Sequence, residues 1–215
     1  MMAVASDAKA FLFDFDMTLA DSSYTIHNCT NLLAEHFGLN GVTREQVLYT
    51  IGFSIEQSWR HLFGDFKEEW LKYYRENFRG LEESGLRLFP NAVATLEALR
   101  SNGYKVGVVT NRHFAMRPIK ATGLEPLLDV VVGLEDGNPP KPDPYILLKG
   151  SERIGVLPSE TIYVGDTDID MKTSVAASVR GIGMTTGNFD GEQLKAAGAW
   201  RTLDDLGGII PLIGR

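Results

Sequence analysis

The stretch FLFDFDMTLA (residues 11–20) joins a short apolar run to two aspartates that stand two positions apart. The apolar run is typical of a buried strand. Side chains two positions apart along a strand point to the same side, so Asp14 and Asp16 are expected to project together just beyond the strand. Such a pair is also typical of solvated turn aspartates, and only the other strands of the chain can decide between these interpretations.

Further apolar runs, rich in β-branched residues, follow along the chain with helix-like segments between them. In one such segment, residues 91–102, Asn91 is expected to cap the helix, and Gly103 is expected to end it. This alternation predicts an α/β fold, a doubly wound parallel sheet with helices on both faces. The expected strands are residues 10–15, 105–109, 129–132, 161–164 and 180–184, and the other expected helices of this part are residues 144–154 and 169–177.

The stretch from residue 19 to residue 85 interrupts the alternation, because it holds amphipathic helical patterns and no convincing strand. A Thr-Arg-Glu-Gln capping box begins at Thr43. We therefore predict a small inserted helical domain at 19–85 and an α/β core made of 1–18 and 86–215. The expected helices are residues 23–37, 43–49, 55–63 and 65–78, and the aromatic residues Trp59, Phe63, Trp70, Tyr73, Tyr74 and Phe78 are expected to form their core.

Composition and charge bound the class of protein. The 215 residues, 44% hydrophobic and 23% charged, are typical of a folded globular chain. The net charge of −7 disfavours nucleic acid and anionic membranes as partners. The single cysteine, Cys29, cannot close an intramolecular disulfide, and the sequence shows neither a signal-peptide pattern nor an apolar run of roughly 18 residues. We expect a cytoplasmic protein, with its oligomeric state left open.

Polar residues that suit an anion follow two further elements. Thr110 and Asn111 come directly after the expected strand 105–109, where a hydroxyl and free backbone N–H groups can cradle a phosphate. A threonine in this place is also typical of a helix N-cap. Lys141 stands in the segment NPPKPDP (residues 138–144), whose prolines stiffen the loop around it. A lysine held in this way before a helix is suited to bind an anion.

Carboxylates gather at the same edge of the expected sheet. Asp14 and Asp16 follow the first strand, and three more aspartates follow the strand 161–164 in the segment GDTDID (residues 165–170). The carboxyl ends of parallel strands share one edge, and converging carboxylates repel one another unless a cation lies among them. Mg²⁺ prefers carboxylates, water and phosphate oxygens, whereas zinc prefers histidine and cysteine. The sequence therefore predicts Mg²⁺ and phosphoryl chemistry at this edge.

Four segments, FDFDMTLADS (13–22), VVTNR (108–112), KPDP (141–144) and YVGDTDID (163–170), resemble in this order the four motifs of the haloacid dehalogenase superfamily. The helical insertion resembles the cap of the subgroup that contains phosphoglycolate phosphatases and β-phosphoglucomutases. The resemblance spans nearly the whole chain. It implies a Mg²⁺-dependent phosphatase that hydrolyses a small phosphorylated metabolite through an aspartyl-phosphate. One departure is Met17, where many of these phosphatases carry glycine.

The resemblance implies a role for each motif residue. Asp14 would be the nucleophile that attacks phosphorus, and Asp16 would protonate the leaving group and then activate water. An aspartate at position 16 favours phosphate esters, since dehalogenases place an aromatic residue there. The implied Mg²⁺ ligands are Asp14, the main-chain carbonyl of Asp16 and Asp166, with Asp170 in support, and the implied phosphate-binding residues are Thr110, Asn111 and Lys141.

Other functions and several residues stay open at this point. A sugar phosphomutase of the β-phosphoglucomutase type is compatible with every motif. A phosphoacceptor signalling module fits less well because of the motif order and the helical insertion. A non-catalytic phosphate-binding protein fits less well because all the motif residues are present. Arg112 and His113 could face the substrate but are expected to be solvated at a helix start. Asp168 has no implied role and is left as a helix N-cap or a carboxylate that supports the site from behind. The loop 51–54 resembles the cap loop that contacts the leaving group, which leaves the substrate undetermined.

Overall fold

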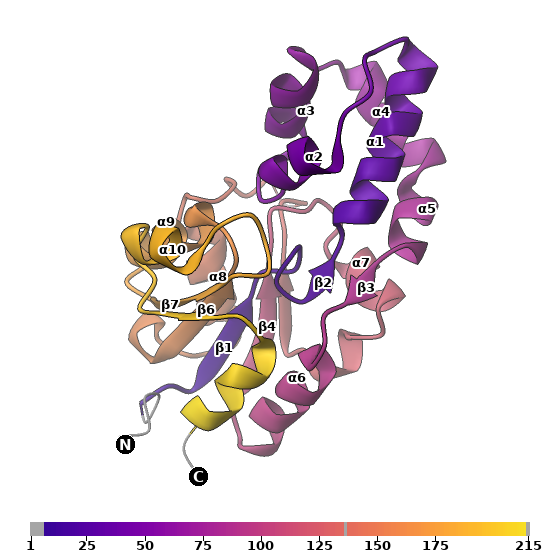
Figure 1. The fold of residues 1–215 in the computed structure, drawn as a ribbon. Coiled ribbons are helices and arrows are strands. Elements are labelled where there is room, and N and C mark those ends of the chain that lie inside the picture. Colours follow the sequence, from indigo (N-terminus) through magenta and orange to yellow (C-terminus); the bar gives the residue numbers. More distant parts are fainter. Residues whose placement is uncertain (1–6, 136, 214–215) are drawn as a thin grey trace.

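The computed structural model describes residues 7–135 and 137–213, which form two lobes (Figure 1). The larger lobe, here called the core, holds a parallel sheet with helices around it. The smaller lobe, here called the cap, is a bundle of helices within residues 23–84 that stands above one end of the sheet. Residues 1–6, 136 and 214–215 of the predicted core lie outside the described part.

The core sheet has six strands in the order β5-β4-β1-β6-β7-β8, and every neighbouring pair is parallel. The central strand β1 pairs with β4 on one side and β6 on the other, so that Phe13 lies between Val108 and Val164. The predicted α/β class with a parallel sheet is therefore confirmed. The strands are β1 (Ala10–Phe13), β4 (Lys105–Val109), β5 (Val130–Val132), β6 (Thr161–Gly165), β7 (Arg180–Met184) and β8 (Arg201–Leu203).

Helices cover both faces of this sheet (Figure 1). Phe11 and Phe13 of β1 belong to the apolar cluster that includes Leu96 and Leu99 of α6, whereas Leu12 belongs to the opposite cluster with Ile146 of α8. This alternation fixes which way the residues after β1 point. The helices of the core are α6 (Ala92–Ser101), α7 (Met116–Ala121), α8 (Tyr145–Arg153), α9 (Asp168–Ala176) and α10 (Gly191–Ala196), with the 3-10 helices η1 (Glu125–Leu127), η2 (Pro158–Glu160) and η3 (Leu206–Leu212).

The start of α6 differs from the prediction. Asn91 occupies the N-cap position, but its backbone is left-handed, with φ 63°, and its side chain caps no N–H of the helix. The side-chain amide donates instead to Asp205, 114 residues further along the chain. A tertiary contact has therefore replaced the local cap that the sequence pattern indicates, and the prediction of a capping Asn91 is wrong.

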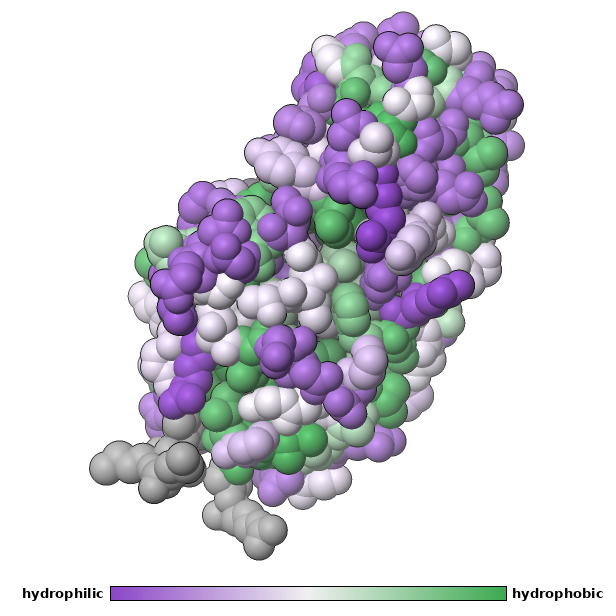
Figure 2. All heavy atoms as spheres, in the orientation of Figure 1, coloured by the Kyte–Doolittle hydropathy of each residue, from purple (hydrophilic) through white to green (hydrophobic). Residues whose placement is uncertain are grey.

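The cap consists of α1 (Ser23–Phe37), α2 (Arg44–Thr50), α3 (Ile55–Phe63), α4 (Glu68–Asn77) and α5 (Arg79–Ser84). The capping box predicted at Thr43 is confirmed, since Thr43 and Gln46 bond each other's backbone N–H groups. Trp59, Trp70 and Tyr74 are buried in one cluster, as predicted for a helical core. Figure 2 shows hydrophilic side chains predominating on one outer face of the cap. Across residues 7–135 and 137–213, every helix is too short or too polar to cross a membrane.

A two-stranded antiparallel ribbon joins the two lobes (Figure 1). It pairs β2 (Ala20–Asp21) with β3 (Arg87–Leu88), where the chain leaves the core and where it returns. The sequence predicts no strand at 19–85, and this prediction is wrong at β2. Two residues are too few to show the alternating pattern of a strand. The ribbon holds both connections of the cap together at one point.

The turn between β1 and β2 explains the departure at Met17. Met17 has φ 56°, in the left-handed region where glycine is the least strained residue. Its N–H bonds the carbonyl of Ala20, and its carbonyl accepts a 2.5 Å hydrogen bond from Thr186. These bonds hold a non-glycine residue in this conformation, and the turn brings the backbone round beneath the cap.

Candidate active site

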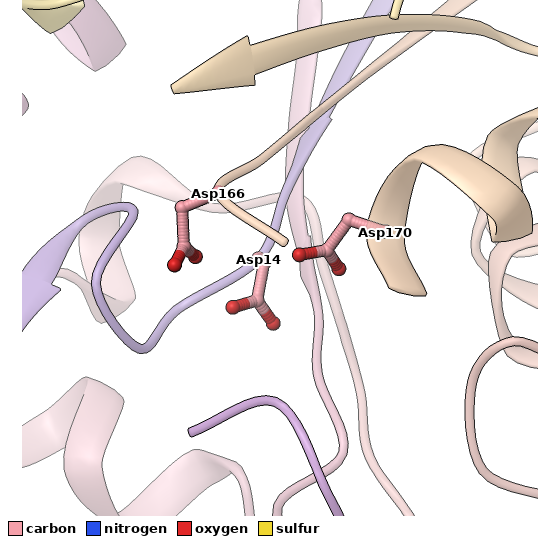
Figure 3. A group of neighbouring side chains, drawn as sticks. All are labelled: Asp14, Asp166 and Asp170. Atoms are coloured by element: carbon pink, nitrogen blue, oxygen red, sulfur yellow. The ribbon is translucent and has the colours of Figure 1, made fainter. Parts of the chain in front are cut away.

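Three carboxylates meet at the carboxyl end of the sheet (Figure 3). Asp14 follows β1, Asp166 follows β6, and Asp170 lies in the first turn of α9. Each offers an oxygen within 4.8 Å of the others, and all three side chains are buried. Burial, offset only in part by Lys141, raises the pKa of Asp14 to about 7, and burial together with Asp170 and Asp14 raises the pKa of Asp166. Such a group favours a bound cation, because a cation removes the cost of ionising buried carboxylates.

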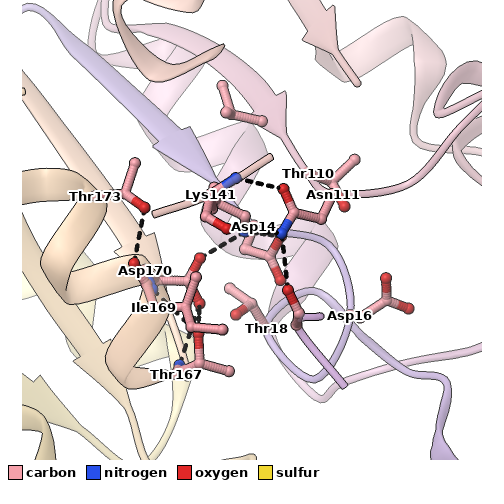
Figure 4. A network of polar contacts seen from close by, with 12 residues as sticks. Asp14, Asp16, Thr18, Thr110, Asn111, Lys141, Thr167, Ile169, Asp170 and Thr173 are labelled. Carbon is pink, nitrogen blue, oxygen red and sulfur yellow. Dashed lines mark hydrogen bonds and ion pairs between the residues drawn. The ribbon is translucent and has the colours of Figure 1, made fainter. Parts of the chain in front are cut away.

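The ammonium of Lys141 lies beside two of these carboxylates (Figure 4). Its Nζ is 2.8 Å from Asp14, 2.6 Å from Asp170 and 3.0 Å from the hydroxyl of Tyr163, and its side chain is only 1% exposed. Burial alone would lower the pKa of Lys141, but the two carboxylates outweigh burial and raise it. Lys141 is therefore a fixed positive charge next to Asp14.

Asp170 is held from a second direction by the start of α9. Thr167 is the N-cap, and its hydroxyl and backbone N–H both donate to Asp170, which completes a capping box. The sequence interpretation of Asp168 as an N-cap is wrong, because Asp168 lies one position later and pairs with Lys172 at the surface. Asp170 thus orients Lys141 and is itself oriented by the helix start.

Asn111 connects the loops around the site. Its amide nitrogen donates to the carbonyl of Gly52 in the cap at 2.8 Å, and its oxygen accepts from the backbone N–H of Lys141 at 2.8 Å. The neighbouring Thr110 is buried, and its hydroxyl accepts from the backbone N–H of Arg112 at 3.3 Å. The side chain of Asn111 is thus committed to positioning Lys141 and the cap loop, which leaves its backbone N–H for a ligand.

Asp16 points away from Lys141 (Figure 4) and binds a different cation. Arg112 donates to both oxygens of Asp16 at 2.7 Å and to Glu82 of α5 at 2.5 Å. The Tyr74 hydroxyl bonds the other oxygen of Glu82. Burial acts to raise the pKa of Asp16, but the charge and hydrogen bonds of Arg112 hold that pKa below its ordinary value.

The prediction of a solvated Arg112 is wrong, because the guanidinium is largely buried between core and cap. Sequence reasoning missed it because its partner Glu82 reaches it only through the fold of the cap. The one signal was its place directly after Thr110 and Asn111. His113, by contrast, is exposed at the edge of the same cavity, as predicted, and partial burial and then Arg75 lower the pKa of its imidazole.

A cavity of about 170 Å³ lies between cap and core. Its core side brings together Asp14, Asp16, Thr110, Asn111 and Lys141. Asp166 and Asp170 lie behind this wall, within reach of Asp14. The cap side is apolar in part and carries the loop predicted to contact a leaving group, with the apolar lining formed by Ile26, Ile51, Phe53, Ile55, Trp59, Leu62 and Leu71.

The chain is similar to known hydrolases. The family model described as haloacid dehalogenase-like hydrolase matches residues 11–184. The pyrophosphatase PpaX of Bacillus pumilus is 28% identical over 181 residues, which cover 83% of this chain and 84% of that protein. The phosphoglycolate phosphatase of Aquifex aeolicus is 29% identical over 175 residues, which cover 80% and 82%.

Solved structures show the same fold. A haloacid dehalogenase-like hydrolase from Bacteroides fragilis superimposes with a TM-score of 0.85 at 31% identity, covering 94% of this chain and 100% of that one. A β-phosphoglucomutase from Clostridium difficile, at 21% identity and a TM-score of 0.78, covers 94% of this chain and 93% of its own and shares the fold. The prediction of a hydrolytic enzyme is confirmed, and the chain belongs to the haloacid dehalogenase-like hydrolases.

Proposed function

We propose that this protein is a Mg²⁺-dependent phosphatase that hydrolyses a small phosphate monoester through an aspartyl-phosphate on Asp14. The observation that carries the proposal is the meeting of Asp14 with Lys141 and two further buried carboxylates beside a cavity under the cap. Membership of a hydrolase family supports the reaction class. A cytoplasmic location stays a prediction.

The residues present fit a magnesium ion. Asp14 and Asp166 are carboxylates whose pKa burial raises, and a hard divalent cation prefers such oxygen ligands. Asp14, Asp166 and the main-chain carbonyl of Asp16 would hold the ion, while Asp170 is committed to Lys141 and Thr167. When bound, Mg²⁺ would offset the negative charge of the phosphoryl group and of Asp14.

In the first half of the reaction, a carboxylate oxygen of Asp14 attacks phosphorus, and the bond from phosphorus to the ester oxygen breaks. The departing oxygen takes a proton from Asp16 in its acid form, which gives the free alcohol and the aspartyl-phosphate. The Lys141 ammonium, the Thr110 hydroxyl and the backbone N–H of Asn111 bind the phosphoryl oxygens. Their charge and hydrogen bonds offset the charge that builds up in the transition state.

In the second half, water attacks the same phosphorus and displaces Asp14. Asp16, now a carboxylate, takes the proton of that water, so that phosphate leaves and both aspartates return to their first states. The contact with Arg112 suits this half, because it holds Asp16 in its ionised form. The first half needs this contact to loosen so that Asp16 can carry a proton.

The cavity size favours a small leaving group. A space of about 170 Å³ holds a short acid or a sugar and excludes a phosphoprotein or a nucleic acid. The relatives include a phosphoglycolate phosphatase and a pyrophosphatase, so 2-phosphoglycolate and pyrophosphate are the first compounds to test.

The test is phosphate release by purified protein with Mg²⁺ from 2-phosphoglycolate, pyrophosphate, hexose phosphates and nucleoside monophosphates. Chelation should abolish turnover, and added Mg²⁺ should restore it. Asp14→Asn should remove turnover and covalent labelling, whereas Asp16→Asn should still label slowly with p-nitrophenyl phosphate. A phosphoryl label on any residue other than Asp14 would contradict the mechanism. A hexose phosphate isomerised without phosphate release would identify a phosphomutase instead.

A further inference from the structure

Two arginines line the cavity, and no acid in the described part of the chain forms an ion pair with either of them. Arg75 lies on α4 and Arg79 on α5, and both are half-buried. Within the described residues, neither guanidinium takes part in an ion pair or a hydrogen bond. An arginine that is partly removed from water normally has such a partner, because burying a charge is costly.

The carboxylates around the cavity are already bound to other cations. Glu82 and Asp16 bind Arg112, and Asp14 binds Lys141. Each of these acids therefore already has a cationic partner. The fourth pair in the lining joins Glu83 to Arg117 at 2.7 Å. The lining thus holds four acids and five Lys or Arg cations, and Arg75 and Arg79 are the two cations that contact none of these acids, in a chain whose net charge is −7.

The two guanidiniums are also held close to each other. Both lie over the ring of Phe114, with centroid distances of 5.7 Å for Arg75 and 4.9 Å for Arg79. Burial and then the charge of Arg79 lower the pKa of Arg75 and outweigh Glu68, which raises it, so the pair carries an electrostatic cost. An anion placed between two such cations would relieve this cost.

We propose that Arg75 and Arg79 bind a second anionic group, a carboxylate or a phosphate, at the far end of the leaving group. The inference rests on the proposed function, in which Asp14 and Lys141 on the core side bind the phosphoryl group that is transferred. The leaving group then faces the cap side, where both arginines lie. A planar guanidinium matches the oxygens of a carboxylate or phosphate with paired hydrogen bonds. The substrate is thus an ester with an acid at each end.

Matched esters that differ only in the second charge test this. We would compare kcat/KM for 3-phosphoglycerate with that for glycerol 3-phosphate, and for 2-phosphoglycolate with that for 2-hydroxyethyl phosphate. Propane-1,3-diyl bisphosphate against 3-hydroxypropyl phosphate tests a second phosphate. In at least one pair, the doubly anionic ester should be favoured about tenfold or more, as expected for a charge-assisted pair in a partly buried site. The pair with the largest ratio identifies the acid and the length.

Variants test whether the two arginines cause this preference for the doubly anionic ester. R75Q/R79Q should bring the ratio close to one, and R75K/R79K should keep part of it, because the charge remains while the planar donors are lost. The control is R60Q, an exposed cap arginine that pairs with Glu56 away from the cavity, and its ratio should equal that of the wild type.

Two results would overturn the inference. One is a wild-type ratio near one for all three pairs while esters are hydrolysed, which leaves the proposed function standing. The other is an unchanged ratio in R75Q/R79Q. If no ester is hydrolysed, the proposed function fails, and calorimetric binding of the same matched esters to the protein still decides the inference. Tighter binding of the doubly anionic member, lost in R75Q/R79Q, supports it, and equal binding rejects it.

Discussion

Arg112 donates hydrogen bonds of 2.7 Å to both carboxylate oxygens of Asp16, and its third contact, with Glu82 at 2.5 Å, ties this core pair to the cap. The ionisation of Asp16 is thereby coupled to the position of α5. When the cap moves away from the core, Arg112 loses Glu82 and keeps Asp16 as its partner, which favours the ionised form of Asp16. When Asp16 gains a proton, Glu82 becomes the main partner of Arg112, so protonation of Asp16 and closure of the cap favour each other.

Replacing Arg112 with methionine should therefore shift the pH profile. Arg112 holds the pKa of Asp16 below its ordinary value, and its loss raises that pKa, by about one unit or more for a partner this close. Asp16 must be ionised to activate water, so the acidic limb of kcat should move to higher pH. The control R60M should leave the limb in place, and an unmoved limb in R112M would show that Arg112 does not set the ionisation of Asp16.

Lys141→Met should lower the free energy of unfolding by about 3–5 kcal/mol, because it leaves Asp14 and Asp170 buried without their cation. Urea denaturation of the metal-free protein measures this. The matched control is Lys172→Met, which removes an exposed helical ion pair with Asp168 and should change stability by no more than about 0.5 kcal/mol. Equal effects of the two substitutions would show that burial of the Lys141 cluster carries no special weight.

The metal-free protein should lose stability as the pH rises from about 4 to about 7. The pKa of Asp14 is raised to about 7 in the folded state, so the folded chain keeps a proton that the unfolded chain loses near pH 4. The contribution of Asp14 is thus present in full below its unfolded pKa and is lost as the pH reaches its folded pKa. Asp166 acts in the same direction.

Thermal melting across this pH range measures the trend, with Asp14→Asn as the comparison. The asparagine variant lacks one of the titrating groups, and its melting temperature should fall less steeply. Mg²⁺ must displace the protons, so it should raise the melting temperature of the wild type more at pH 8 than at pH 5. A stabilisation by Mg²⁺ that does not depend on pH would argue against Asp14 as a ligand.

Gly52→Ala should weaken the closed contact between cap and core. Gly52 has φ 101°, and a Cβ there would lie 3.0 Å from Cγ2 of Thr167, the N-cap of α9. The loop must then shift and loosen its bond to Asn111, so KM should rise several-fold. Gly80→Ala is the control, because its backbone is not left-handed and its Cβ would meet open space in α5. A KM equal to that of the wild type in G52A would exclude this loop from substrate binding.

The strand positions of the core were predictable because buried parallel strands are short apolar runs followed by polar residues. The bounds predicted for β4 and β7 match the structure, those for β5 and β6 differ from it by a single position, and β1 ends at Phe13, two residues before the predicted end at Phe15. β8 and α10 are short and polar, and their pairing with the rest of the core comes from tertiary contacts that a local pattern does not record.

Some residues of the candidate site could likewise be predicted from the sequence, and others could not. The sequence could predict that Asp14, Thr110 and Lys141 lie together, because each follows a strand or stands in a stiffened loop at one edge of the sheet. It could not predict the partners of Arg112, or that Arg75 and Arg79 form no ion pair. They depend on where α4 and α5 come to lie against the core, and helical periodicity says which face of a helix is apolar without saying what that face meets.

The position of β1 at the centre of the sheet bears on how the chain folds as it is synthesised. Its two partners are β4 and β6, so the apolar strand Ala10–Phe13 stays unpaired on one side until residue 165 has left the ribosome. The cap helices contact one another within residues 23–84 and can assemble well before then. We therefore expect the nascent chain to carry a folded cap while its first strand is exposed, an interval in which this strand is open to chaperone binding or aggregation.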